Sequence, residues 1–249
     1  TFTNNQTGIY AYNINNLKLQ SNYFYIGNNF KTGANVQLGI STIFCSGFTI
    51  EENHFFRSNP NIATVFKYGI STNSCGQSAN QIYKNYFTDM SIGNYSTGIN
   101  RNPIDTRLTG LQYLCNENTS NDNFDFFISG KGSPFSGIRL LQGTSKISAG
   151  NIFSYTGLTG TFTDINNVTA VALSYYFDQS KAPQYYNSQV APILAAFSNT
   201  CPSHICQNCN DLLTNGEIQQ MTDSYDSSET AFLNLLYSYN QLLDGGNTN

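Results

Sequence analysis

The residues with the greatest capacity for chemistry are gathered in "TCPSHICQNC", residues 200–209, which holds one of the two histidines and three of the six cysteines. Three thiols and one imidazole can bind zinc, so the candidate metal ligands are Cys201, His204, Cys206 and Cys209. Their spacing, Cys-x4-Cys-x2-Cys with the histidine inside the first gap, matches no common zinc finger. In a secreted chain a local disulfide is the favoured fate, and it leaves one thiol of the three to pair elsewhere or stay free.

The other group with catalytic potential is the acidic doublet Glu51-Glu52, which is followed closely by His54. Glycoside hydrolysis needs two carboxylates that face one groove, and polysaccharide lyases need an acidic calcium cluster with a basic residue. Neighbouring residues of a strand point to opposite faces, so the doublet does not supply such a pair. His54 has no third positioned partner for acid–base work. We therefore predict no catalytic residue, no cofactor and a non-enzymatic protein.

An internal repeat indicates the elements that carry these residues. The stretch "GISTIFC" at residues 39–45 returns as "GISTNSC" at residues 69–75, and each copy is followed by Asn-x-Phe. With a degenerate unit at "GLQYLCNENTS", the repeated asparagines step by 31, 32, 33 and 33 residues, and they are Asn22, Asn53, Asn85, Asn118 and Asn151. A period this steady indicates one structural unit per repeat.

The repeat units predict an all-β fold. Each unit contains short β-prone runs interrupted by Gly, Asn and Ser, and helical periodicity is absent before about residue 180. Such units bury their apolar side by stacking, as in a right-handed parallel β-helix, a β-solenoid whose neighbouring coils pair at ~4.8 Å. The rival fold is a β-propeller, whose blades usually run ~40 to 45 residues. The predicted fold is therefore a right-handed parallel β-helix with a small C-terminal α-helical segment.

Stacked repeats would align equivalent residues into ladders. We expect the five repeated asparagines to occupy a corner with left-handed backbone, with their amides hydrogen-bonded from coil to coil. We expect an interior phenylalanine ladder of Phe24, Phe55, Phe87 and Phe153. The same alignment places Glu52, Lys84 and Glu117 in one register, where their alternating charges indicate an exposed row of ion pairs rather than a catalytic cluster.

The alignment also brings two cysteines together. Cys45 and Cys75 each stand six residues after the glycine of "GIST". In successive coils their Cα atoms would lie ~4.8 Å apart, which falls within the ~4.4 to 6.8 Å window of a disulfide. Either a disulfide or a pair of stacked, reduced core cysteines satisfies this placement. Disulfide candidates are thus Cys45, Cys75, Cys201, Cys206 and Cys209, and the sequence leaves the pairing of Cys115 open.

The domain organisation follows the limits of the repeat. We predict the β-helix over residues 1–178, a linker containing Pro and Cys over residues 179–210, and a helical segment over residues 211–249. The helical segment has a capping-box-like start at Asp226 and an apolar face that includes Phe232, and it reads as the start of a further module. Because the chain opens inside a repeat and closes without a stop signal, we expect it to be part of a longer polypeptide.

Composition narrows the environment and the partners. Charged residues make up only 10% of the chain and the net charge is −4, so nucleic acid is a poor candidate partner. Aromatic residues reach 14% without a tryptophan, and solubility must come from neutral polar side chains, as is typical of extracellular β-rich chains. No apolar run approaches the ~18 residues needed to span a bilayer.

The motifs "GIST..C", "GLQYLCNEN", "DINN" followed by "YYF", "CPSHIC" and "LLDGGNTN" together resemble a known group of proteins. These are the very large secreted surface proteins of Bacteroidota, exported by the type IX system, that carry right-handed β-helix repeats. In such proteins a Cys-Pro-Ser segment separates the β-helix from helical modules. The resemblance covers nearly the whole chain, and it implies a cell-surface location and an architecture rather than an activity.

These observations predict a structural and adhesive module of a large surface protein. Its partners would be further domains of the same polypeptide and, along the solenoid face, polysaccharide or other surface proteins. The alternatives are a carbohydrate-active β-helix enzyme, either a lyase or a hydrolase, and a self-assembling fibre or sheet subunit that uses the open β edges of the solenoid.

Overall fold

The computed structural model of the chain describes residues 1–27, 36–58, 65–102, 104, 109–130, 133–154, 162–205 and 230–232. The chain divides into two compact units, Thr1–Ile205 and Cys206–Asn249. In the second unit the described residues are 230–232, which are helical. The rest of the helix predicted over residues 211–249, together with Cys206 and Cys209, lies outside the described residues.

Three parallel sheets build the first unit, and the predicted all-β class is confirmed. The first sheet contains, in spatial order, β1 (Phe2–Thr3), β4 (Tyr23–Ile26), β7 (His54–Arg57), β10 (Tyr86–Thr88) and β14 (Glu117–Thr119). The second sheet contains β2 (Thr7–Tyr12), β5 (Val36–Ile43), β8 (Phe66–Asn73), β11 (Ile92–Thr97), β15 (Phe124–Ile128) and β18 (Thr163–Asn167). The third sheet contains β3 (Lys18–Gln20), β6 (Thr49–Glu51), β9 (Gln81–Tyr83) and β13 (Gln112–Leu114).

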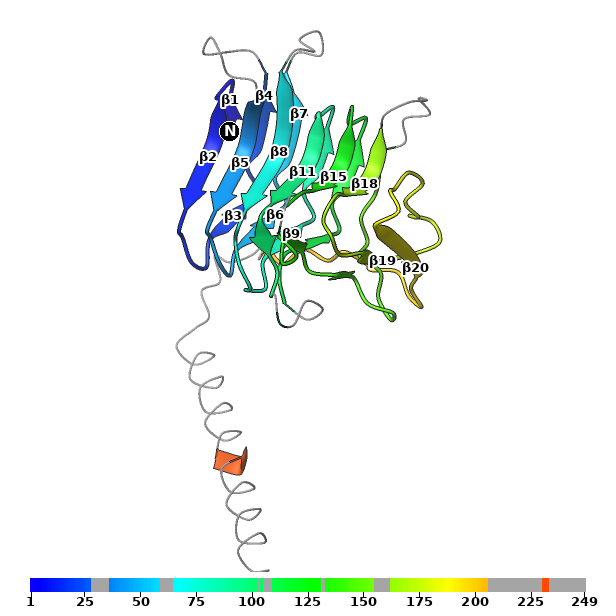
Figure 1. Cartoon of the computed structure of the whole chain (residues 1–249). Coiled ribbons are helices and arrows are strands. Elements are labelled where there is room, and N and C mark those ends of the chain that lie inside the picture. Colours follow the sequence, from blue (N-terminus) through cyan, green and yellow to red (C-terminus); the bar gives the residue numbers. More distant parts are fainter. Residues whose placement is uncertain are drawn as a thin grey trace, which may run out of the picture. The chain divides into compact units, whose positions relative to one another are not determined.

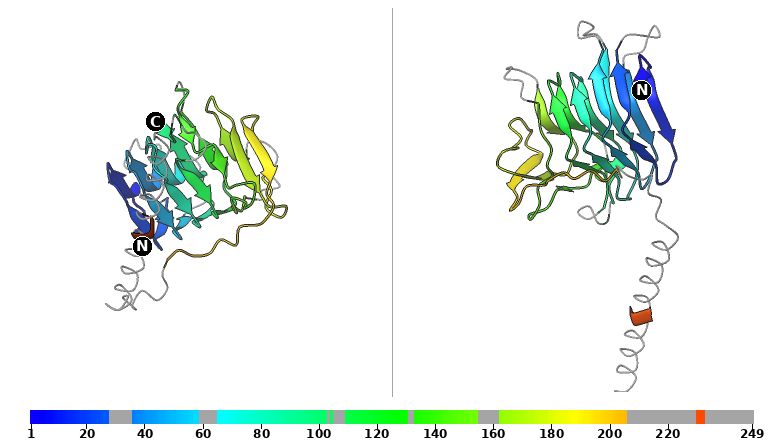
Figure 2. Two further views of the ribbon diagram at one scale, coloured as in Figure 1. Left: turned by 90° about the horizontal axis from the view of Figure 1, so that it is seen from below. Right: turned by 180° about the vertical axis from the view of Figure 1, so that it is seen from behind.

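Two smaller sheets complete this unit. One pairs β12 (Ile99–Asn100) with β16 (Gly137–Ile138), and the other contains β17 (Leu141–Gln142), β19 (Leu173–Phe177) and β20 (Val190–Leu194). The strand β20 lies in the segment predicted as linker, so the boundary of the first unit falls later than the predicted end at residue 178. Figures 1 and 2 show the strands of the second sheet side by side, in the order in which they occur along the chain.

The strands of the three large sheets pair with strands one repeat away. Tyr86 is the register partner of His54 on one side and of Glu117 on the other, and all these pairings are parallel. The chain visits the second, third and first sheets in turn before it returns to the second. The repeat found in the sequence is therefore a repeat of structure, and equivalent residues stack on one another.

The phenylalanine ladder explains why the repeat begins with glycine. The rings of Phe24, Phe55 and Phe87 stack at centroid distances of 4.8 and 4.9 Å, and all three are buried. A Cβ atom added at Gly39 would lie 2.5 Å from the Phe55 ring, and Gly8 and Gly69 meet Phe24 and Phe87 in the same way. Glycine is thus required because the aromatic ring fills the space of its side chain. Phe2 extends the ladder and was not predicted.

Phe153 is not a continuous member of this ladder. The register places Asn118 opposite Phe87, so a polar side chain interrupts the aromatic stack. Phe153 packs edgewise against Phe126 and Tyr175 instead, at 5.5 Å from each ring. The predicted ladder is correct for its first three residues and wrong for the fourth.

The asparagine ladder exists with one different member. The members are Asn22, Asn53, Asn85, Asn116 and Asn151, and the Oδ1 of each member after Asn22 accepts the backbone N–H of the one before it, at 2.8 to 3.1 Å. The prediction of Asn118 was wrong because "NEN" offers two asparagines and the even spacing favoured the second. The left-handed backbone conformation predicted for the asparagines is found at the residue before each of them instead. Ser21, Glu52, Lys84 and Cys115 have φ between 53° and 59°.

Cys45 and Cys75 are both buried free thiols, so of the two predicted alternatives the reduced core cysteines are observed and the disulfide is not formed. The parallel register of β5 with β8 runs to Ile43 and Asn73, two residues before each cysteine. Each thiol bonds to a backbone carbonyl, Cys45 to Ala11 at 3.5 Å and Cys75 to Thr42 at 3.6 Å. Residues in register on parallel strands project their side chains in the same direction, which does not turn one sulfur toward the other.

Candidate functional site

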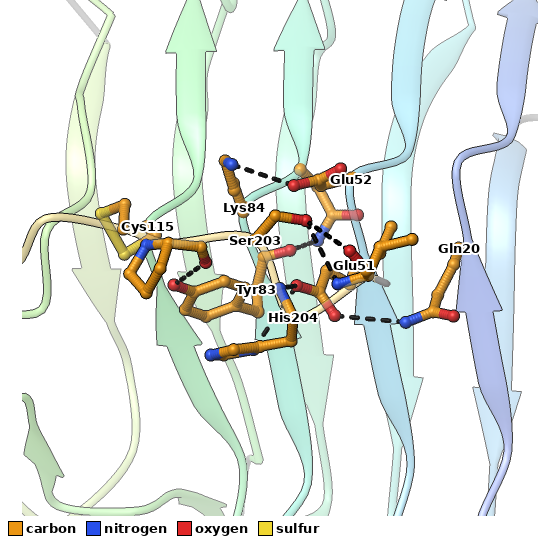
Figure 3. Close-up of polar contacts among 12 residues, drawn as sticks. Gln20, Glu51, Glu52, Tyr83, Lys84, Cys115, Ser203 and His204 are labelled. Atoms are coloured by element: carbon orange, nitrogen blue, oxygen red, sulfur yellow. Dashed lines mark hydrogen bonds and ion pairs between the residues drawn. A yellow bond between two sulfur atoms is a disulfide. The ribbon is translucent and has the colours of Figure 1, made fainter. Parts of the chain in front are cut away.

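Some of the residues singled out from the sequence meet at one segment, residues 201–205, here called the strap, and they are Glu51, Glu52, Lys84, Cys201 and His204. A disulfide between Cys115 and Cys201 anchors it, with Cα atoms 5.6 Å apart across a separation of 86 residues. Figure 3 shows the strap residues Ser203 and His204 among side chains from β3, β6 and β9 and from the residues that follow β6 and β9. The predicted local disulfide of "CPSHICQNC" is therefore wrong for Cys201, because this cysteine pairs with one from a distant repeat.

Glu51 binds the strap through its carboxylate. Its Oε1 accepts the backbone N–H of His204 at 2.7 Å, and its Oε2 accepts the side-chain amide of Gln20 at 3.2 Å. The residue is fully buried, and His204 Nδ1 lies 3.4 Å from Oε1. A buried carboxylate requires hydrogen-bond donors, and both oxygens of Glu51 have one. We infer that Glu51 has a structural role in holding the strap.

Tyr83 provides the second attachment. Its hydroxyl donates to the carbonyl of Pro202 at 2.7 Å, and its ring stacks on His204 with centroids 4.3 Å apart. Burial, with smaller contributions from Glu51 and Glu52, raises the pKa of Tyr83 to about 12. The hydroxyl therefore keeps its proton and remains a donor at neutral pH.

Glu52 forms the outer part of this contact. Its carboxylate lies 2.9 Å from Lys84 Nζ, which confirms the predicted pairing of these two charges. Desolvation raises the pKa of Glu52, but hydrogen bonds from Lys84 and Ser203 outweigh it and the net shift is downward. The predicted row of ion pairs does not extend to Glu117. The residue that aligns with Lys84 in the next repeat is Cys115, which has the same left-handed backbone conformation, and Glu117 aligns with Tyr86 instead.

The strap contact does not have the geometry of a catalytic triad. Ser203 Oγ accepts the N–H of Ile205 at 3.1 Å and bonds to Glu52, while His204 faces Glu51 and Tyr83. Nucleophilic catalysis requires the hydroxyl to bond the imidazole, and here the two side chains have different partners. The zinc hypothesis also loses a ligand, since Cys201 is in a disulfide. In the described part of the chain no three His, Cys, Asp or Glu side chains form a metal-binding group.

His54 belongs to a row of aromatic residues on the outer side of the first sheet. Its ring stacks between Tyr23 and Tyr86, at centroid distances of 4.6 and 4.5 Å. Beside it, Tyr25 stacks on Phe56 at 5.4 Å, and Tyr23 and Tyr25 are about two-fifths exposed, at 43% and 39%. Burial lowers the pKa of His54, with partial opposition from Glu52. We call these five residues the outer aromatic row.

Two buried carboxylates escaped the sequence analysis. Asp125 on β15 and Asp164 on β18 occupy the same register position, because their neighbours Phe126 and Ile165 are paired. Both are at most 1% exposed. Burial raises the pKa of Asp125 to about 7 and that of Asp164 to about 6, although backbone and side-chain donors oppose the shift. A sequence signal for these two residues exists, because each aspartate stands at the strand position where the earlier repeats have glycine. The alignment that reveals it requires the strand register, which the sequence alone does not give.

Comparison with protein-family models, curated proteins and solved structures finds no match to this chain. Function must therefore be argued from the molecule itself. Among the described residues, no helix combines the length and apolar character needed to cross a bilayer. The molecule offers three features that bear on function: the strap contact, the outer aromatic row and the buried pair of aspartates.

Proposed function

We propose that the chain is a right-handed parallel β-helix that serves as a non-enzymatic structural and adhesive module of a large secreted surface protein. The β-helix is supported by parallel pairing of each strand with its equivalent one repeat away, since propeller blades are built from antiparallel strands. The right hand follows the strong preference of parallel crossover connections. The resemblance to type IX secretion substrates of Bacteroidota supplies the location, and the Cys115–Cys201 disulfide is compatible with an extracellular environment.

The outer aromatic row carries the adhesive part of the proposal. Stacked rings hold one another rigidly, so little conformational entropy is lost when a partner binds their exposed edges. Tyrosine combines an apolar body with a hydroxyl that can donate to a sugar or a peptide carbonyl. The first sheet thus presents a regular strip that suits an extended polymer such as a polysaccharide.

The proposal is tested by retention on polysaccharides. The protein should bind one or more members of a panel of insoluble polysaccharides, and Tyr23→Ala with Tyr86→Ala should weaken that binding at least tenfold. Tyr10→Ala with Tyr12→Ala is the matched control, because these tyrosines are exposed on the second sheet, at 61% and 55%. Failure of the whole panel, or equal binding by both double variants, would contradict an adhesive role for this row.

A carbohydrate-active enzyme is the second candidate, and Asp125 with Asp164 is the observation that favours it. Two carboxylates with raised pKa values in register on neighbouring strands are the kind of pair that divides acid and base roles. Incubation with the same polysaccharides, followed by measurement of new reducing ends, distinguishes the candidates. We expect no release, and release that disappears in Asp164→Asn would establish the enzyme instead.

A further inference from the structure

After its last strand, β20, the chain of the first unit turns back over earlier repeats. The backbone N–H of Phe197 donates to the carbonyl of Lys146 at 2.9 Å, and that of Asn199 donates to the hydroxyl of Ser148 at 3.0 Å. The left view of Figure 2 shows this return toward the first repeats. The first unit therefore ends against repeats that the chain has already built.

The returning segment is attached to one repeat after another. Its anchor residues are spaced by 33, 32 and 32 positions, about one repeat each, and they are Ser148, Cys115, Tyr83 and Glu51. In the same order they hold Asn199, Cys201, Pro202 and His204. Five residues thus cross three steps between repeats, about 14 Å, which is close to the reach of an extended chain. The segment runs along the direction in which the repeats stack and ties four of them together.

The strap is anchored in the repeats that carry the outer aromatic row. Glu51 stands three residues before His54, and Tyr83 stands three residues before Tyr86. Only two residues separate β6 from β7, and two separate β9 from β10. The ladder asparagines stiffen these connections, because their amides donate to the carbonyls of Glu51 and Tyr83 at 3.0 and 3.1 Å. A force on the row can therefore reach the strap through two short, hydrogen-bonded connections.

The disulfide determines which part of the chain such a force would stretch. Tension that enters the strap from the chain after residue 205 reaches Cys201 and crosses to Cys115 through the bond between their sulfur atoms. Residues 116–200 lie in the loop that this bond closes, so they carry no tension while it is intact. They include β15, β18, β19 and β20.

We propose that the strap is a mechanical clamp. It passes tension from the chain beyond residue 205 directly to the repeats that carry the outer aromatic row, and it keeps residues 116–200 free of that tension. The source of the tension rests on the proposed function, in which a ligand holds the row while the rest of a large surface protein pulls on the chain. The clamp itself rests on the disulfide and on the bonds of the strap to Glu51 and Tyr83.

Single-molecule pulling on the whole chain tests the clamp. One handle is attached at Tyr23, in the row, through an azide-bearing phenylalanine analogue that keeps the aromatic ring, and the other through a peptide tag after Asn249. Excess reductant should increase the length released on complete unfolding by about 300 Å, because the disulfide spans 86 residues at ~3.5 Å each. Release of the full length without reductant, or no gain with it, would overturn the proposal.

Hydrogen exchange at the backbone amide of His204 tests the non-covalent attachment, since this amide donates to Glu51. Tyr83→Phe keeps the ring that stacks on His204 and removes the hydroxyl that donates to Pro202. It should speed exchange about fivefold, the change that corresponds to one hydrogen bond of about 1 kcal/mol. Tyr10→Phe is the matched control, because Tyr10 is 61% exposed on the second sheet, and it should leave the rate unchanged.

Equal exchange rates in the two variants would contradict the clamp, since the hydroxyl of Tyr83 would then add nothing to the hold on the strap. The pulling experiment applies the tension itself, so its result does not depend on a ligand. Retention on polysaccharide by a protein that releases its full length without reductant would refute the clamp and leave the proposed function standing. The gain of about 300 Å in a protein that binds no polysaccharide would refute the adhesive role and leave the clamp standing.

Discussion

The disulfide between Cys115 and Cys201 should be a major source of stability for the first unit. It closes a loop whose ends are 86 residues apart, and the chain-entropy model gives about 4.5 kcal/mol for a loop of that length. The bond also holds the strap. Without it, the strap would be held by its hydrogen bonds to Glu51 and Tyr83 alone. We expect Cys115→Ser with Cys201→Ser to lower the free energy of unfolding by about 4 to 5 kcal/mol.

Urea denaturation followed by tyrosine fluorescence or circular dichroism measures this loss. With a slope of about 2 kcal/mol per molar urea, the midpoint should fall by roughly 2 M. The unaltered protein in excess reductant is the control, because it loses the same bond without a substitution and should match the double variant. A loss below about 1 kcal/mol would refute the reasoning, since it would mean that the cross-link constrains little of the unfolded chain.

Three further outcomes follow from buried groups. Because burial raises the pKa of Asp125 to about 7, the folded state binds an extra proton between about pH 4 and 7, and the free energy of unfolding should fall by up to about 4 kcal/mol as pH rises through that range. Asp125→Asn should remove this contribution from the profile measured by denaturation at several pH values, and the fall below about pH 6 that comes from Asp164 should remain. Phe55→Ala should lower the free energy of unfolding by about 3 to 5 kcal/mol in urea titrations, against less than about 1 kcal/mol for the exposed Tyr23→Ala. Asn85→Ala should cost about 2 to 4 kcal/mol by the same measurement, because it removes the side-chain acceptor of the Asn53 backbone N–H and the amide donor to the carbonyls of Ile50 and Tyr83. A loss below about 0.5 kcal/mol would mean that the asparagine ladder is dispensable.

The repeat could be read from the sequence where its spacing is regular. Asn53 and Asn85 follow Asn22 by almost equal steps, each with a phenylalanine two residues later, so register and burial were predictable together. The prediction failed at Asn118 because the loops between strands change in length, and a constant step then selects the wrong asparagine of "NEN". Spacing identifies a ladder only while the connecting loops keep their length.

The strap and the buried aspartates were beyond prediction for a different reason. Pairing Cys115 with Cys201 requires the path of the chain after β20, which no local pattern specifies. Asp164 appears in the sequence as an ordinary polar residue of a strand-like run. Its burial becomes predictable only from the register, which aligns it with Asp125 and with Gly93 of the earlier strands. Local patterns reveal periodic contacts, whereas contacts made once in a chain depend on the complete fold.

The pairing of glycine with phenylalanine has a consequence for how such a chain can change length. Removing residues 53–84 would bring Asn22 onto Asn85 and Phe24 onto Phe87, with Gly39 facing the ring of Phe87 in place of Phe55. Adding a copy of the same segment would preserve the match equally well. The aromatic part of the stack is therefore free to grow or shrink by whole repeats, each worth ~4.8 Å, while any fractional change would set a side chain where glycine is needed.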